Sequence, residues 1–184
     1  MFLDEGGFSL LPLVRRTWAP VGATPILRRI GRHRQKVSAI SAVTVSPRRR
    51  RLGLYYRFFP DRSAKAPDVI EFLRHLLRHV RGRVILLWDR SNSHKAAIVK
   101  AFLCRVSARL EIKWLPAYAP ELNPDEHVWG LLKHHRLANH GLRTLDELHR
   151  RLHYHMARLR KRQDLLWACI RASDLPFDTA ALSP

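Results

Sequence analysis

The hydrophobic positions of the first third of the chain follow a strand-like pattern. Residues 36–45 alternate apolar and polar side chains and are rich in β-branched residues, and residues 52–59 are rich in aromatic ones, so both segments are predicted to be strands. Ser46 and Pro47 open a turn between them, which predicts a β-hairpin. Before the hairpin stands a short apolar start, Met1 to Leu3, followed by two acids and the pair Gly6-Gly7.

Further along, helical spacing alternates with short apolar runs. Apolar residues from Val69 to Val80 recur every three or four positions, which predicts a helix that closes at Gly82. The continuous apolar run 84–88 is typical of a strand covered on both faces. The remaining predicted elements are a helix over 93–104, a strand over 112–115, a helix from Asn123 and Pro124, and a last helical stretch that starts at a capping box, Thr144 to Glu147.

This order of elements predicts the fold class. Antiparallel strands come first, and helices then alternate with strands, so we expect an α/β fold with a mixed sheet and helices on both faces. We expect residues 1–184 to form a single domain of that fold. Polar residues just beyond the carboxyl ends of strands form the usual site in such sheets, and Asp89 stands directly after the run 84–88.

The charge of the chain indicates a polyanionic partner. Lys and Arg number 34 and Asp and Glu 15, which gives a net charge of +19. Arg outnumbers Lys and forms bidentate contacts with phosphate, which favours nucleic acid. No apolar run approaches the roughly 18 residues that span a bilayer, and acids stand where a signal peptide needs bases, so we expect a cytoplasmic protein without a membrane partner. The residues that we expect to contact DNA are Arg48, Arg49, Arg50, Arg51, Arg90, Lys95 and Lys133.

Cysteine and histidine do not point to a zinc site. Cys104 and Cys169 form no paired motif, and we expect both to be reduced thiols buried in helices. His149 and His153 are one helical turn apart and His155 is near, but no Cys or acid is spaced to complete a tetrahedral set.

Three acids are candidates for phosphodiester chemistry, which needs hard oxygen ligands for Mg²⁺ or Mn²⁺. Asp4 follows the apolar start, Asp89 ends the run 84–88, and Glu126 lies in the first turn of the helix from Asn123. Each has a structural alternative. Asp4 could be an ordinary surface acid, Asp89 could cap the following helix, and Glu126 could belong to a capping arrangement with Asn123.

Three segments resemble a known family. The segment WLPAYAPELNPDEHVWGLLK, Trp114 to Lys133, resembles the motif around the third acid in transposases of the insertion-sequence-630 group, part of the mariner superfamily. The segment VILLWDRSNSHKA resembles the second-acid motif, with Asp89 and His94 at the matching positions, and LDEGGF resembles the first-acid motif, with Asp4.

This resemblance implies a ribonuclease-H-like fold and a metal-dependent enzyme that cuts and joins DNA in cut-and-paste transposition. It maps the catalytic and metal-binding acids to Asp4, Asp89 and Glu126, with His94 and Asn123 as accessory candidates. It implies two divalent ions, Mg²⁺ or Mn²⁺, and transposon ends and target DNA as partners. We expect a homodimer on DNA, in a bacterial, nucleoid-associated setting.

The chain departs from the family pattern at three places. Arg90 stands where Asn usually follows the second acid, although Asn92 is near, and Asp125 stands at a usually apolar position. The chain begins too close to Asp4 to hold the family's N-terminal helix-turn-helix region. We therefore expect that region to be encoded separately, or the chain to be a truncated copy.

Two rival functions remain open at this point. A ribonuclease-H-like nuclease would share the acids, although the Pro-rich third motif argues against it. A catalytically inactive DNA-binding remnant of a transposon would explain the charge, although the three acids are present.

Overall fold

The computed structural model describes residues 1–11, 13–27, 35–46, 51–89 and 96–175. Within these ranges the chain forms one five-stranded sheet with the strand order β3-β2-β1-β4-β5. The strands are β1 (Phe2–Ser9), β2 (Lys36–Val45), β3 (Leu52–Pro60), β4 (Val84–Trp88) and β5 (Leu110–Trp114).

The sheet is mixed, as predicted. β2 runs antiparallel to both β1 and β3, and its pairing with β3 is the predicted hairpin, in which Val45 lies opposite Leu52. β4 runs parallel to β1 and to β5. The central strand is β1, which the pattern of residues 1–8 did not predict, because two acids and two glycines interrupt the apolar residues. β5 lies at 110–114, two residues before its predicted start.

The helices largely follow the predicted spacing. α2 begins at Ala97, with Ala96 as its N-cap, and the predicted start at residue 93 lies outside the described residues. The predicted last helical stretch is two helices, because the chain breaks its helical path at residues 160–162. The helices are α1 (Ala66–His79), α2 (Ala97–Arg105), the short 3₁₀ turn η1 (Pro120–Leu122), α3 (Pro124–Gly130), the π-helical turn η2 (Leu131–Arg136), α4 (Leu145–Leu159) and α5 (Gln163–Ala172).

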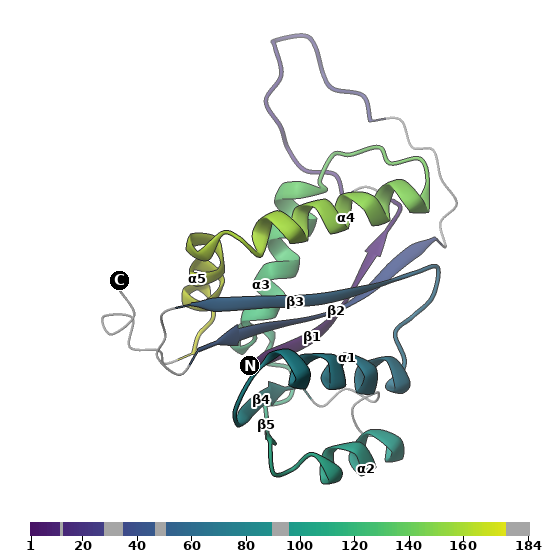
Figure 1. Cartoon of the computed structure of the whole chain (residues 1–184). Coiled ribbons are helices and arrows are strands. Elements are labelled where there is room, and N and C mark those ends of the chain that lie inside the picture. Colours follow the sequence, from purple (N-terminus) through teal and green to yellow (C-terminus); the bar gives the residue numbers. More distant parts are fainter. Residues whose placement is uncertain (12, 28–34, 47–50, 90–95, 176–184) are drawn as a thin grey trace.

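Helices cover both faces of the sheet, as Figure 1 shows. Alternate residues of β1 point to opposite faces. Phe2 and Phe8 join the core with α3, α4 and α5, whereas Leu3 joins the core with α1 and α2. The architecture agrees with the expected α/β class. None of the helices in the described part of the chain is long and apolar enough to cross a membrane.

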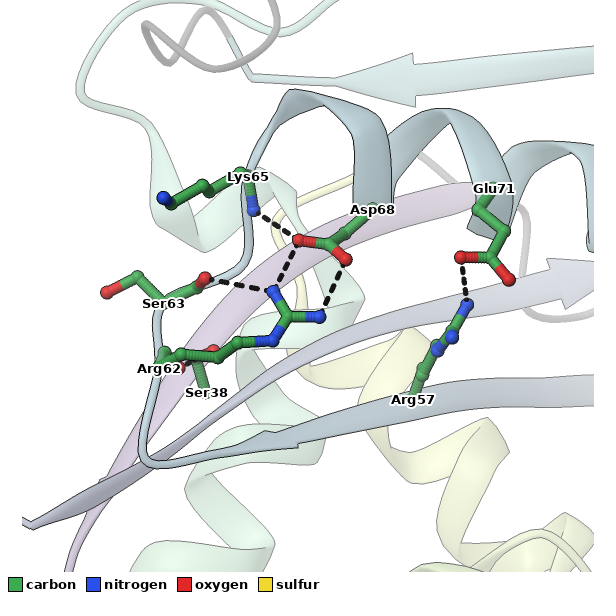
Figure 2. Close-up of polar contacts among 7 residues, drawn as sticks. All are labelled: Ser38, Arg57, Arg62, Ser63, Lys65, Asp68 and Glu71. Atoms are coloured by element: carbon green, nitrogen blue, oxygen red, sulfur yellow. Dashed lines mark hydrogen bonds and ion pairs between the residues drawn. The ribbon is translucent and has the colours of Figure 1, made fainter.

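A polar junction fixes α1 at the end of β3. The Arg62 guanidinium donates to both carboxylate oxygens of Asp68, at 2.7 and 2.8 Å, and the backbone N–H of Lys65 donates to the same carboxylate (Figure 2). Ser38 of β2 donates its hydroxyl hydrogen to the Arg62 carbonyl at 2.7 Å. The geometry is bidentate and charge-assisted, so this corner sets the direction in which α1 leaves the sheet.

Candidate active site

The strand register places the first two acids side by side. Phe2 of β1 lies opposite Leu87 of the parallel strand β4, so Asp4 is level with Asp89, two residues further along each chain. Side chains two residues apart share a face, so both acids lie on the face that carries α3. Asp4 is 8% exposed, and Asp89 is half-buried just beyond the end of β4.

α3 is tied to this face by two side-chain hydrogen bonds. The Trp129 indole N–H donates to Oδ2 of Asp4 at 3.0 Å. The Ser41 hydroxyl donates to Oδ1 of Asp125 at 2.6 Å, and Ser41 is the residue of β2 opposite Asp4. The helix that carries Glu126 is therefore anchored directly at the first acid.

Gly6 makes the approach of Trp129 possible. A Cβ atom at Gly6 would lie 2.9 Å from Cε2 of Trp129, closer than such atoms approach in real structures. Any side chain there would push the indole off β1. Gly6, two residues after Asp4, and Trp129, three residues after Glu126, therefore form one packing contact.

Two neighbouring acids in the first turn of α3 differ in their burial. Asp125 is fully buried, whereas Glu126 is exposed. Asn123 caps the helix, because its side-chain oxygen accepts the Asp125 N–H at 3.2 Å. The exposed carboxylate of Glu126 is thus available to a ligand, and Asp125 serves the packing of the helix.

Crowding of carboxylates in a buried place changes their ionisation. Burial first, and then repulsion by Asp125, Glu126, Glu5 and Asp89, raises the pKa of Asp4 to about 9. Burial also raises the pKa of Asp125 to about 8, against the lowering effect of the Ser41 hydroxyl. Close carboxylates that hold a proton at neutral pH form a place where a cation would be stabilised.

The acids are near one another without forming a closed metal cage. Within the described ranges, no group of three or more His, Cys, Asp or Glu side chains is arranged to hold a metal ion. The Nε2 atoms of His149 and His153 lie 3.1 Å apart, one helical turn apart on α4. Cys169 is buried as expected, whereas Cys104 is exposed, so its predicted burial is wrong.

The residues expected to contact DNA are only partly described. Arg51 is exposed at the start of β3. Lys133 is half-buried in η2, with its Nζ atom 5.7 Å from the centre of the Phe8 ring. The others, together with the accessory candidate His94, lie outside the described residues: Arg48, Arg49, Arg50, Arg90 and Lys95.

Sequence reasoning missed the partners that position the acids. Ser41 and Gly6 carried no signal that separates them from ordinary strand residues. Trp129 was part of the third motif, and Asp125 stood out as a departure from the family pattern, but neither observation by itself gave a contact. The hydrogen bonds from Trp129 to Asp4 and from Ser41 to Asp125 join residues 125 and 84 positions apart, which no local pattern reveals.

The pKa values predict how stability depends on pH. Folding raises the pKa of both Asp4 and Asp125 above the ordinary value of 3.8. Both side chains therefore bind a proton more tightly in the folded chain than in the unfolded one, and this proton binding stabilises the fold. This stabilisation is complete below about pH 4 and is lost as pH rises toward 8 and 9. In EDTA, the wild type should therefore lose a few kcal/mol of unfolding free energy between pH 5 and 9, whereas Asp125→Asn should lose less.

Denaturant unfolding at pH 5, 7 and 9 checks this expectation. Asp174→Asn is the matched control, because Asp174 is exposed, and it should follow the wild type at every pH. An Asp125→Asn protein that loses as much stability as the wild type between pH 5 and 9 would contradict a pKa raised by burial.

Comparison with known proteins gives both a fold and a family. The structure is similar to a Mos1 transposase paired-end complex with left transposon end, with a TM-score of 0.67 and 22% identity over 92% of this chain and 50% of that one. It is also similar to the Mos1 mariner paired-end complex with Mn, with a TM-score of 0.62 and 20% identity over 96% and 56% of the two chains. The catalytic domain of Mos1 mariner transposase matches with a TM-score of 0.55 and 16% identity, over 96% and 84%.

These likenesses show a ribonuclease-H-like fold, as expected from the sequence. The chain spans about half the length of the transposase chains in the two complexes. A comparison with curated proteins gives no significant match. Residues 1–149 match the family described as DDE superfamily endonuclease, and because they make up most of the sequence, the chain belongs to that family.

Proposed function

We propose that this chain is the catalytic domain of a transposase of the insertion-sequence-630 group, within the mariner superfamily. It would cut DNA at transposon ends and join them to target DNA. The proposal rests on one observation in a chain that belongs to the DDE family. Asp4 and Asp89 are level with each other, and the helix that carries Glu126 packs on the same face of the sheet. The long third motif favours this group over others.

Asp4, Asp89 and Glu126 would hold the divalent cations, Mg²⁺ or Mn²⁺, and two ions are expected. The residues fit such ions by their chemistry, because they offer hard carboxylate oxygens whose mutual repulsion at Asp4 a cation would relieve. When bound, the ions neutralise charge on the scissile phosphate and activate the attacking oxygen. Mos1 complexes with Mn and with Mg support the same choice of ion here.

The other residues of the site hold these acids in position. The Trp129 indole fixes one oxygen of Asp4, and the Asp125–Ser41 bond holds the start of α3 against β2. Basic side chains such as Arg51 and Lys133 would contact DNA phosphates without reading sequence. His94 and Asn123 remain accessory candidates, and for Asn123 the capping bond supports a positioning role.

The expected assembly has further parts. We propose a homodimer on DNA, because two transposon ends must be brought together, and the paired-end complexes of Mos1 support this. Residues 1–184 would form one catalytic domain. Recognition of the end sequence would come from a separate helix-turn-helix part.

The test is nicking and strand transfer on supercoiled plasmid in Mg²⁺ or Mn²⁺, with Asp89→Ala beside the wild type. The wild type should give metal-dependent joined products, and Asp89→Ala should give none. Asp146→Asn, which changes an exposed acid in the first turn of α4, is the control and should act as the wild type. Cut ends without joined products would favour a ribonuclease-H-like nuclease. DNA binding with no cleavage at all would favour an inactive remnant.

A further inference from the structure

We propose that the outer edge of β3 forms the floor of a second DNA-binding groove, which holds the sugar-phosphate backbone of duplex DNA away from the acids. The inference rests on the proposed function only in taking DNA as the partner. β3 is an edge strand of the sheet, and α1 and α4 flank it on opposite sides (Figure 1).

Two adjoining hollows run along this edge. One has a volume of about 580 Å³ and lies between residues of α1 and α4, and the other, of about 680 Å³, continues toward the start of β3. Both are lined by Tyr55, Tyr56 and Arg160, so they meet at the middle of the strand. The result is one trough along β3, with helices as its walls.

The trough is lined by positive charge from three elements. Arg78 comes from α1, Arg160 and Lys161 follow the end of α4, and Arg51 stands at the start of β3. Among the described residues that line it, Glu71 is the one carboxylate, and it is 2.8 Å from the Arg57 guanidinium (Figure 2). Its negative charge is therefore already balanced, and the trough suits a polyanion.

The floor supplies backbone donors as well as charge. The Gln163 side chain binds both the N–H and the C=O of Leu52, at 2.8 and 3.0 Å, so the backbone of Leu52 points away from β2. Backbone groups alternate along a strand, so those of Leu54 and Tyr56 point the same way, into the trough. Backbone N–H groups and arginine side chains are the usual contacts to DNA phosphates.

The groove and the acids would contact different stretches of DNA. Tyr56 is opposite Ser41, which is opposite Asp4, so the floor is two strand spacings, roughly 10 Å, from the first acid. The two hollows are lined by residues 51–57, a stretch of about 23 Å, enough to follow roughly seven base pairs. The groove thus adds affinity for DNA beyond the reacting phosphodiester.

The experiment compares two triple variants that each remove three positive charges. The groove variant is Arg78→Ala/Arg160→Ala/Lys161→Ala, and all three side chains are exposed, so folding should be kept. The control, away from the trough, replaces three other exposed arginines, as Arg105→Ala/Arg143→Ala/Arg171→Ala. Binding of a 30-base-pair random-sequence duplex to the full chain is measured by fluorescence anisotropy in EDTA, from 50 to 200 mM NaCl, roughly the range over which phosphate contacts show their salt dependence.

Affinity falls as salt rises, and the groove variant should make this fall shallower, reducing the magnitude of the slope of log affinity against log salt by about 2 to 3, since each phosphate contact contributes about 0.9. Its affinity at 0.1 M salt should fall by at least about tenfold, and that of the control by less than about threefold. Equal losses in the two variants would show diffuse charge and overturn the proposal, as would an unchanged slope in the groove variant. Because EDTA prevents cleavage, this result is independent of whether the acids cut DNA.

Discussion

Glu126→Gln is expected to abolish metal-dependent DNA cleavage, whereas Asp125→Asn is expected to retain most of it. The two acids are neighbours in sequence, but Glu126 is exposed beside Asp4 and Asp125 is fully buried against Ser41. Gln keeps the size of the Glu126 side chain and removes its charge. A carboxylate that holds a catalytic cation contributes several kcal/mol to the transition state, so the cleavage rate should fall on the order of 10³-fold.

The rate of plasmid nicking in Mn²⁺ measures this effect, and the Asp125→Asn protein is its matched control. Asn can still accept the Ser41 hydrogen bond through its oxygen, so α3 should stay in place. If Asp125→Asn were inactive and Glu126→Gln active, Asp125 would be the third acid, and α3 would have to rotate to expose it. If both variants kept full activity, the proposed acid triad would be wrong.

Trp129→Ala is expected to lower the free energy of unfolding by about 3–5 kcal/mol, a large part of the stability of a domain this size. The indole is 1% exposed, lies against Gly6 and meets the Phe8 ring edge-on at a centroid distance of 5.6 Å. Its removal leaves a cavity between α3 and β1 and takes the hydrogen bond from Asp4 at the same time.

Trp129→Phe separates packing from positioning. It keeps an aromatic ring near Gly6 but loses the N–H that binds Asp4 and the second ring of the indole, so stability should fall by about 1–3 kcal/mol. The Mn²⁺ concentration for half-maximal cleavage should rise about tenfold, because Asp4 no longer has a fixed orientation. Trp114→Phe, on a half-exposed ring stacked on Trp88, is the control and should leave this concentration unchanged. A Trp129→Phe enzyme with the wild-type metal dependence would reduce Trp129 to a packing residue.

The elements of the fold were predictable where the hydrophobic pattern is local. The alternation at 36–45, the apolar run 84–88 and the helical spacing from Val69 each reflect burial against the sheet, and the structure has β2, β4 and α1 there. β1 escaped prediction because its polar residues serve the site: Asp4 and Gly6 occupy positions that an ordinary central strand fills with apolar side chains.

The sequence by itself determined most of the elements other than β1, the basic charge and the candidate acids, because local burial patterns, net charge and motif spacing can be read directly along the chain. Only the tertiary structure decided that Asp4 and Asp89 are level, that Trp129 binds Asp4, and that Asp125 is buried while Glu126 is exposed. The physical reason is that these contacts join residues that are far apart in the sequence. A hydrogen bond or a pKa depends on which groups approach in space, and here the partners come from strands and a helix up to 125 residues apart.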